Sequence, residues 1–469
     1  MRVSTWCSPA AVVWGGMATF AAGLGTLAAL EHRAFETGRF DLGNMAQAVW
    51  STAHGRPLEV TELHGDQITR LGAHVDPLLA AFAPVWWLWP SPAMLVVCQA
   101  IILALGALPV FWLARKHLGS ARDGALCGIA YLLYPPIQWL ALDEFHPVAL
   151  ACPLLTFAFW YLDEDRLRAA APFLLLAALS REEMPLVVGA LGVWYALAKS
   201  RRVAGALVAL AGAASSAIAF GVVMPYFREG TESAFFGRYE TVGGSPVGIL
   251  ETVFRNPGAL LGALTDGRDL LYLLALGLPL ALLFLLSPLI LLAAIPELAA
   301  NLLSSTDTQT SIRFHYTAPI VPFLIGGAVL GAARLPRPRV GALILLGASL
   351  AGAVLLGPLR AGELVPDRRS PHDGVAVRAL ALIPEGAAVS STNGLGAHLS
   401  ARRRIHSFPV VRDADWIVVD LARASYLDRR SAASTTAVPL AELLRSGSWA
   451  TEFEEDGVFV LRRATTSTP

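Results

Sequence analysis

Charged side chains are scarce in this sequence of 469 residues. Asp, Glu, Lys and Arg together make up 15% of it, and the only lysines are Lys116 and Lys199. A soluble globular domain carries about 25% charged residues. Hydrophobic residues reach 55% and the mean hydropathy is +0.55, so the composition predicts a polytopic membrane protein. The formal net charge is zero, which leaves no basic field that would favour nucleic-acid binding.

Cysteine is also rare. The chain has four, at Cys7, Cys98, Cys127 and Cys152, and three of them sit inside apolar runs. No two of them form a CxxC pair. We therefore interpret them as small hydrophobic residues rather than as a disulfide framework or a zinc site.

Long apolar runs, in contrast, are abundant and predict about 11 transmembrane helices, since a helix needs roughly 20 apolar residues to cross a bilayer. The candidate spans are 11–30, 92–114, 124–142, 147–162, 169–181, 184–198, 203–225, 270–285, 288–303, 317–333 and 340–357. No convincing cleavage site follows the first run, which favours an uncleaved helix over a signal peptide. Several runs are short and flanked by proline. We interpret 169–181 with 184–198, and 270–285 with 288–303, as helical hairpins.

Basic residues gather in four short segments between these runs: "ARKHLGSARD", "DEDRLR", "KSRR" and "RLPRPR". Lysine and arginine favour cytoplasmic loops, so this bias predicts a cytoplasmic N-terminus. The outer segments are then 31–91, 143–146, 226–269, 304–316 and the tail after 358. We expect a multi-pass protein of the cell membrane.

The tail, 358–469, has a different pattern from the helical domain predicted over 1–357. "AAVSST", "DWIVVDLA" and "GVFVLRR" are typical of short buried strands, and "HDGVAVRALALIP" and "PLAELLRSG" of amphipathic helices. This alternation predicts a small extracytoplasmic α/β domain. "TNGLGAHLS" lacks the GxGxxG pattern, so we interpret it as a plain turn.

Most ionisable residues outside the basic loops fall at the predicted outer face. The candidate catalytic residues there are Asp41, Asp143 and Glu144, and the candidate substrate-binding residues are His74, His146, Arg181, Glu182, Arg238, Tyr239, His315 and Tyr316. Ionisable groups near lipid are costly and usually line a cavity or a pathway. Carboxylates with histidine can hold a divalent cation such as Mg or Mn, a carboxylate can act as general base, and arginine grips phosphate. This combination describes glycosyl transfer from a lipid-phosphate sugar whose tail lies in the bilayer.

Structural alternatives stand beside these roles. Asp41 begins the stretch "DLGNMAQAVW", so an alternative interpretation of this residue is a helix N-cap. Asp143 and Glu144 are equally consistent with solvated acids at a helix end, His146 with a turn histidine, and Glu182 with the cap of a half-helix.

Several stretches resemble one family when they are taken together and in order. They are "FDLGNMAQAVWSTAHGR", "DEFHPVALACPLL", "LSREEMPLVVGALG", "FFGRYETVGGSP", "FHYTAPIVPFLIGGAVL" and, in the tail, "IPEGAAVSSTNGLGAHLSARRRIHSFP". They are similar to the predicted membrane proteins of domain-of-unknown-function family 2079, over nearly the whole chain. That family is grouped with the GT-C glycosyltransferases, polytopic enzymes that use polyprenyl-phosphate sugars.

The resemblance implies a role for particular acids. In the GT-C pattern an acidic residue of the first outer loop serves as catalytic base or metal contact, and Asp41 is the matching position. A second acidic site in the next outer loop is matched by Asp143 or Glu144. A single Asp stands at position 41, where better-known members have an Asp-Asp or Asp-Glu pair, so the sequence leaves the need for a metal open.

Three function classes fit these observations. The preferred hypothesis is a glycosyltransferase that takes a sugar from a polyprenyl-phosphate donor to an unknown acceptor at the extracytoplasmic face. The alternative is a transporter or lipid-handling protein without a bond-making step, in which the hairpin around Arg181 would form a broken-helix site. The absence of a repeat between halves disfavours transport. A third reading is a non-catalytic scaffold for assembly of the cell envelope.

Overall fold

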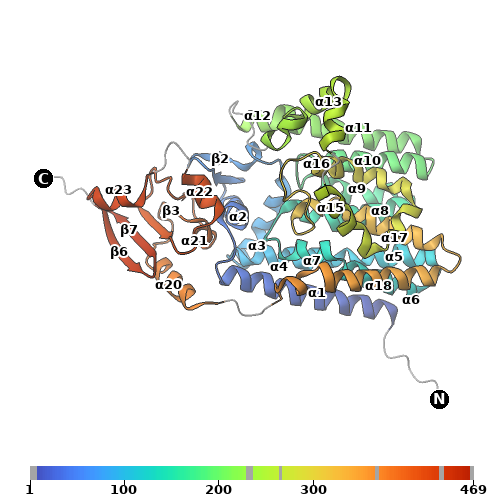
Figure 1. Cartoon of the computed structure of the whole chain (residues 1–469), viewed down its shortest axis with the longest axis horizontal. Helices are drawn as coiled ribbons and strands as arrows, with labels where there is room; N and C mark the ends of the chain where they lie inside the picture. Colours follow the sequence, from blue (N-terminus) through green and yellow to red (C-terminus); the bar gives the residue numbers. More distant parts are fainter. Residues whose placement is uncertain (1–7, 229–235, 264–266, 365–368, 433–437, 465–469) are drawn as a thin grey trace, which may run out of the picture.

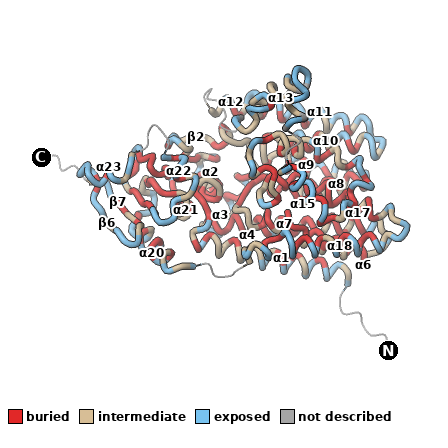
Figure 2. Tube along the Cα trace, in the orientation of Figure 1, coloured by how far each residue is buried: buried red, intermediate tan, exposed pale blue. Residues whose placement is uncertain are grey.

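The structure is a computed structural model that describes residues 8–228, 236–263, 267–364, 369–432 and 438–464. A helical bundle makes up most of it, and a small domain with a five-stranded sheet lies at one end of the bundle (Figure 1). Buried residues run through the middle of the bundle and through the sheet (Figure 2). The predicted fold class, a helical membrane domain with a small α/β domain, is confirmed.

Four helical stretches are long and apolar enough to cross a membrane within the described residues. They are α1 (Pro9–Arg33), α4 with α5 (Ala93–Leu105, Ala107–Leu118), α11 with α12 (Arg202–Ile218, Met224–Phe227) and α18 with α19 (Pro338–Leu356, Pro358–Ala361). A fifth would be α6 (Ala121–Leu133) with α7 (Pro135–Leu142), which are bent by 47°. The bend falls at Tyr134, because the residue before a proline is driven out of the helical region. The predicted count of about 11 crossings stays a prediction.

Shorter helices complete the bundle. They are α8 (Ala151–Asp163), α9 (Leu167–Ala178), α10 (Met184–Ala198), α13 (Pro246–Arg255), α14 (Pro257–Ala263), α15 (Gly267–Gly277), α16 (Ile295–Leu302) and α17 (Val321–Ala333), with short turns η4 (Pro147–Leu150), η5 (Ala219–Val223), η6 (Phe236–Val242) and η10 (His315–Thr317). The hairpin predicted over 169–181 and 184–198 corresponds to α9 and α10, which pack against each other.

The helical hairpin predicted over 270–285 and 288–303 forms only in part, since α15 ends at Gly277 and α16 begins at Ile295. The chain passes from α15 to α16 through three 3₁₀ turns, η7 (Leu278–Leu280), η8 (Leu283–Leu286) and η9 (Pro288–Ala294). Pro279 and Pro288 cannot donate backbone hydrogen bonds, and Ala281 and Leu282 adopt left-handed φ values of 50° and 55°. The segment is apolar throughout, so composition alone conceals these breaks.

Close contact between α10 and α11 fixes the helices around the site. A Cβ atom on Gly212 would lie 2.3 Å from the Pro185 carbonyl oxygen, and one on Gly205 would lie 2.5 Å from that of Gly192. Small residues of this kind let membrane helices approach closely. The pairing matters because α10 begins just after Arg181 and Glu182, while α11 leads into the wall of the main cavity.

The segment between α1 and α4 is a folded layer with its own core. It contains the π-type turn η1 (Arg39–Gly43), α2 (Asn44–Ala53), the hairpin of β1 (Glu59–Thr61) and β2 (Gln67–Thr69), η2 (Arg70–Gly72), η3 (Pro77–Phe82) and α3 (Ala83–Leu88). Leu42, Met45, Val49, Leu79 and Trp86 are buried together in it. Asp41 therefore sits on a packed element rather than on a loose loop.

The tail domain is built on one mixed sheet. The strands run in the order β4 (Ile405–Ser407), β3 (Val389–Ser391), β5 (Trp416–Asp420), β7 (Val458–Arg463) and β6 (Trp449–Glu455). The first three are parallel and the last two pair antiparallel. The helices are α20 (Pro371–Leu380), α21 (Asn393–His398), α22 (Tyr426–Ala432) and α23 (Leu440–Arg445). The three predicted strands match β3, β5 and β7, and "TNGLGAHLS" turns from β3 into α21. The domain boundary at 358 stays a proposal.

The basic loops meet at the end of the bundle away from the tail domain. Asp163 accepts a hydrogen bond from Lys116 Nζ at 2.7 Å and pairs with Lys199 Nζ at 2.8 Å, while His117 Nε2 lies 2.8 Å from it. Nearby, Arg201 donates to Asp165. This clustering agrees with loops that share one side of the membrane, and which side that is stays a prediction.

Candidate active site

Asp41 lies in η1, where the chain turns from α1 into α2, and Glu144 holds this turn. The Oε1 atom of Glu144 accepts a hydrogen bond from the Gly38 amide at 2.9 Å, and Oε2 accepts one from the Leu42 amide at 2.8 Å. Glu144 itself has a left-handed φ of 43°, which is uncommon for a residue with a side chain. Both of its oxygens are engaged by backbone. The geometry therefore favours a supporting role for Glu144 over the catalytic role predicted.

The N-cap alternative for Asp41 is wrong. The residues that precede η1 and α2 are Gly38 and Gly43, and neither helix start uses the Asp41 side chain. Within the described residues no hydrogen bond reaches its carboxylate. Burial raises the pKa of Asp41 to about 6, and Asp143 raises it too, against an opposing effect of Arg70 and Arg238. A carboxylate that titrates near neutral pH is suited to act as a general base.

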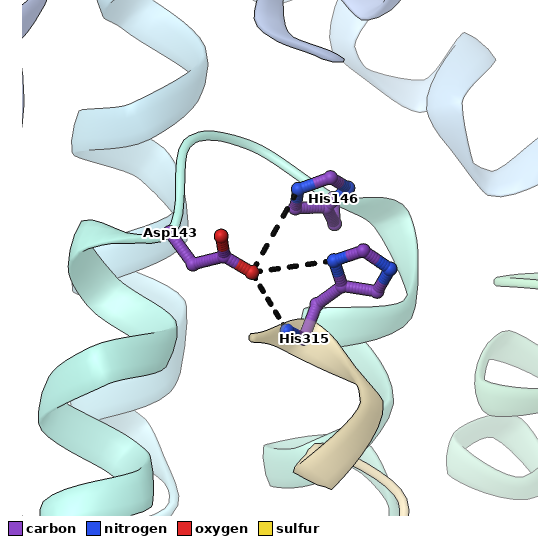
Figure 3. A group of neighbouring side chains, drawn as sticks. All are labelled: Asp143, His146 and His315. Carbon is purple, nitrogen blue, oxygen red and sulfur yellow. Dashed lines mark hydrogen bonds and ion pairs between the residues drawn. The ribbon is translucent and has the colours of Figure 1, made fainter. Parts of the chain in front are cut away.

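Asp143, His146 and His315 form a compact group beside this turn (Figure 3). The backbone amide and Nδ1 of His315 lie 2.6 and 3.2 Å from Asp143 Oδ2, and His146 Nε2 lies 3.9 Å from the same oxygen. The two imidazole rings stack with their centroids 3.7 Å apart. The buried Gln99 fixes the loop, because its Oε1 accepts the His146 amide and its Nε2 donates to the Glu144 carbonyl.

The donor atoms of this group suit a divalent transition metal. They all lie within 4.8 Å of one another, and burial lowers the pKa of both histidines, which keeps them in the neutral form that binds metals. Two imidazoles and one carboxylate match Mn, Fe or Zn better than Mg, which prefers oxygen ligands. Of the two ions named from the sequence, the donor set fits Mn.

A cavity of about 330 Å³ opens next to the group. Its apolar walls come mainly from α10, η5 with α12, and α16, through Leu186, Phe220, Met224, Pro296, Ala299, Ala300 and Leu303. The helix formed by α11, η5 and α12 is exposed along most of its length, including Ile218 and Val222. In a membrane protein such a face contacts lipid, so one wall of the cavity borders the bilayer.

The polar side of the cavity contains most of the remaining candidate residues. Arg181, Glu182, Arg238, Tyr239, Tyr316 and His74 all line it. Arg238 Nη1 donates to the Tyr316 hydroxyl at 3.0 Å, and the guanidinium groups of Arg181 and Arg238 lie 5.6 and 5.7 Å from the Tyr316 ring centre. The two arginines thus flank one aromatic ring.

Glu182 is held from the first outer segment. His74 Nδ1 lies 2.9 Å from its Oε1, and the Val75 amide donates to its Oε2 at 2.9 Å. The cap reading of Glu182 is wrong, because α10 has no side-chain cap. His74 and Glu182 therefore join the first outer segment to the turn before α10.

Several residues of the site were not predicted. Arg70 and Asp76 are both almost fully buried and form an ion pair, with Arg70 Nε 2.8 Å from Asp76 Oδ2. Glu297 of α16 lines the cavity. The signal for Glu297 was a lone acid within an apolar run, since an ionisable residue at membrane depth is by default a functional candidate. Gln99, a buried amide inside α4, carried the same kind of signal.

The structure thus divides the predicted residues between two adjoining places. Asp41, Asp143, Glu144, His146 and His315 surround the η1 turn, and the other six line the cavity. Tyr316 connects them, because its ring centre lies 4.2 Å from that of His315. Their catalytic and binding roles stay predictions.

The fold is shared with a glycosyltransferase of known structure. ArnT from Cupriavidus metallidurans, in its apo state, is similar with a TM-score of 0.54 and 15% sequence identity, and the match covers 96% of this chain and 98% of that one. The chain therefore shares the fold of ArnT over nearly its whole length. No curated protein matches it in sequence.

The family profile described as "Predicted membrane protein (DUF2079)" matches residues 31–460. This range contains every candidate site residue and both parts of the molecule. The chain belongs to the DUF2079 family of multi-pass membrane proteins.

Proposed function

We propose that this protein is a glycosyltransferase that moves a sugar from a polyprenyl-phosphate donor to an acceptor hydroxyl. The observation that carries the proposal is a two-faced cavity in which one lining residue, Arg238, also acts electrostatically on Asp41. One face is apolar and borders lipid, and the other presents Arg181 and Arg238. A polyprenyl chain fits the first face and a phosphate fits the second.

The reaction requires a base for the incoming hydroxyl. The acceptor oxygen attacks the anomeric carbon, the bond from that carbon to the phosphate oxygen breaks, and polyprenyl phosphate leaves. The hydroxyl proton passes to Asp41, which acts in its ionised form. Arg70 and Arg238 are close enough to stabilise that form electrostatically.

Charge balance in the cavity bears on the need for a cation. Two arginines and three glutamates line it, namely Arg181, Arg238, Glu182, Glu183 and Glu297. Glu183 pairs with Arg181 at 3.0 Å, and Glu182 with His74. An anionic donor would enter a pocket in which acids outnumber arginines. A divalent cation held by Asp143, His146 and His315 would supply the missing positive charge near the leaving phosphate.

The metal proposal predicts a specific response to chelation. In purified protein, EDTA should abolish transfer, and Mn should restore it better than Mg because imidazole ligands favour Mn. His315→Ala should remove the restoration by Mn, as measured by initial rates across a Mn titration. Full activity in EDTA would show that no metal is needed.

The test of the function itself uses protein purified in lipid nanodiscs. It is incubated with polyprenyl phosphates that carry neutral hexoses, pentoses or amino sugars, together with cell-envelope glycans as acceptors. We expect acceptor-dependent release of polyprenyl phosphate from one donor class, and none from an Asp41→Asn variant that is folded as completely as the wild type. Release that is unchanged in Asp41→Asn would remove Asp41 from the mechanism, and movement of an intact donor across the membrane of sealed proteoliposomes would favour the transporter alternative.

The orientation belongs to the same proposal. With the basic loops in the cytoplasm, Asp41 and the tail domain lie at the extracytoplasmic face, where the acceptor would be met. A cysteine-labelling experiment with a membrane-impermeant maleimide at position 64 and, separately, at position 166 tests it. We expect labelling from outside at 64 only.

A further inference from the structure

The tail domain forms several hydrogen bonds with η1, the turn that carries Asp41. Arg39, the first residue of η1, is 2% exposed although it is charged. Its guanidinium donates to the Ile405 carbonyl at 2.6 Å, the Ser407 hydroxyl at 2.7 Å and the Thr61 carbonyl at 2.7 Å. A buried guanidinium is stable only when such acceptors surround it. Arg39 thereby ties η1 to strand β4 of the tail and to β1 of its own segment.

Helix α21 of the tail holds the next residue. The Phe40 amide donates to Asn393 Oδ1 at 3.1 Å, and Asn393 is itself fixed because its own amide donates to Asp428 Oδ1 at 2.7 Å. The Gly38 and Leu42 amides, in contrast, donate to Glu144 of the bundle. Alternate amides of the turn are therefore held from opposite sides, one side by the bundle and the other by the tail domain.

Glycine residues allow η1 and the tail domain to approach each other closely. A Cβ on Gly38 would lie 2.5 Å from the side-chain Nδ2 of Asn393, and one on Gly43 would lie 2.6 Å from Ser400 Oγ and 3.2 Å from Ala397 Cα. On the tail side, a Cβ on Gly396 would lie 2.8 Å from Arg39 Cβ. Side chains at these positions would force η1 and α21 apart.

The same surface continues on both flanks of the turn. At the end of α1, the ring of His32 stacks on that of His398 with centroids 4.1 Å apart. At the β1–β2 hairpin, Arg412 donates to both oxygens of Asp66 at 2.9 and 3.1 Å. The interface therefore runs from the end of α1 to the β1–β2 hairpin, with η1 between them.

We propose that the tail domain sets the position of Asp41, with Arg39 and Asn393 as positioning residues, a role that rests on the proposed function. Asp41 is next to Phe40, whose amide Asn393 holds, and two residues from Arg39. The pattern explains why a membrane enzyme would carry a soluble domain that contributes no described side chain to the lining of the cavity. That domain completes the site by shaping backbone rather than by binding substrate.

The first test measures the turn without relying on activity. Hydrogen–deuterium exchange is followed in nanodiscs for peptides that cover 38–46, in the full chain and in Asn393→Ala. Loss of one hydrogen bond is expected to speed exchange of the turn about fivefold, since such a bond contributes about 1 kcal/mol. Asn393→Asp keeps an acceptor oxygen and should restore most of the protection.

The matched control is Arg412→Ala, which weakens the same interface at its edge. It should leave exchange over 38–46 unchanged while exchange rises at the β1–β2 hairpin. If Asn393→Ala exchanges like the wild type over 38–46, the tail does not hold the turn and the proposal fails. If Asn393→Ala disrupts the tail domain, Arg39→Lys serves in its place. This substitution removes the guanidinium hydrogen bonds to Ile405, Ser407 and Thr61 but keeps the positive charge.

The second test uses the donor and acceptor that the transfer assay identifies. Asn393→Ala should lower kcat about tenfold with little change in the donor KM, because the base is displaced while the cavity is intact. Asn393→Asp should recover kcat, and Arg412→Ala should match the wild type. An equal kcat in Asn393→Ala would overturn the positioning role. Absence of transfer in the wild type would instead refute the proposed function and leave the exchange result standing.

Discussion

The two ends of the helical bundle treat the same kind of side chain in opposite ways. Asp163, at the basic end, is surrounded by Lys116, His117 and Lys199, each with a nitrogen within 2.8 Å of its carboxylate. Asp41, at the tail end, receives no hydrogen bond from any described residue and faces another acid, Asp143. The first carboxylate is satisfied by the fold and can do little else. The second is held in place by its backbone, and its oxygens are left for chemistry.

The pKa values of acids at the two ends of the bundle also differ in direction. Hydrogen bonds from Arg201 and Tyr195 lower the pKa of Asp165, at the basic end, to about 2. Burial raises that of Asp41 to about 6. Perturbation toward neutrality in a cleft, rather than away from it, is a mark of functional sites. The comparison therefore supports the proposed assignment of the reaction to the tail end of the bundle.

The largest expected effect on the transfer rate comes from neutralising one acid at each end of the bundle in turn. Asp41→Asn should lower the transfer rate by about 10²–10⁴-fold, because a general base contributes that much. Asp163→Asn should leave kcat per folded molecule unchanged. Rates normalised to folded protein by size-exclusion chromatography measure both, and a large loss of kcat in Asp163→Asn would break the comparison.

For the free energy of unfolding, we expect the larger loss from Asp163→Asn rather than from Asp41→Asn. Asp163→Asn leaves Lys116, His117 and Lys199 crowded without their anion, and we expect a loss of about 1–3 kcal/mol, less than for a fully buried pair because both lysines are partly exposed. Asp41→Asn should stabilise slightly, since it removes a buried charge beside Asp143. Denaturation in mixed micelles, compared at equal detergent, gives both values. Destabilisation by Asp41→Asn would show that its carboxylate has a partner in the fold.

A pH series sharpens the contrast further. Transfer should rise about tenfold per pH unit up to pH 6 and level off above it, because Asp41 must be ionised to accept a proton. Asp41 binds its proton more tightly in the folded state than in the unfolded state. Its contribution to stability therefore falls as pH rises from about 4 to about 6. The wild type should show this fall and Asp41→Asn should not, as followed by melting temperature against pH.

The smallest effect is expected at the exposed pair of the basic end. Arg201→Ala removes the partner of Asp165, and the side chains are 56% and 35% exposed. Exposed ion pairs contribute little to folding, so the melting temperature should not change measurably. A clear decrease would mean that the basic end depends on its surface charges as a network.

The sequence predicted the division into a helical membrane domain and a small α/β domain. Burying charge or exposing apolar surface costs free energy, so the hydrophobic pattern follows the fold closely. A run such as 340–357 has few alternatives to a membrane helix, and α18 covers nearly the same residues. The strands at 389–391 and 458–463 were visible for a similar reason, since short β-branched runs pack into a sheet core. The grouping of Asp143 with His146 and His315 was accessible because the sequence places all three in outer segments.

The failures concern backbone and long-range contacts. The interruption at 278–294 depends on proline position and left-handed residues inside a uniformly apolar run, which hydropathy cannot resolve. The sequence placed Glu144 among the acids of the candidate site, and its catalytic role stays a prediction. Only the structure shows that its two oxygens are committed to the Gly38 and Leu42 amides. The grip of Arg39 on β4 joins positions 366 residues apart, and no local pattern encodes such a pairing.

The contact between Phe40 and Asn393 joins residues separated by 353 positions, and it orders events during synthesis. Because a chain emerges from its N-terminus, Asp41 reaches the membrane long before α21 exists to seat it. Every helix of the bundle can insert while the turn is still unheld. Under the proposed function, the enzyme would therefore become active only after the tail domain has folded against η1, and incomplete chains would transfer no sugar.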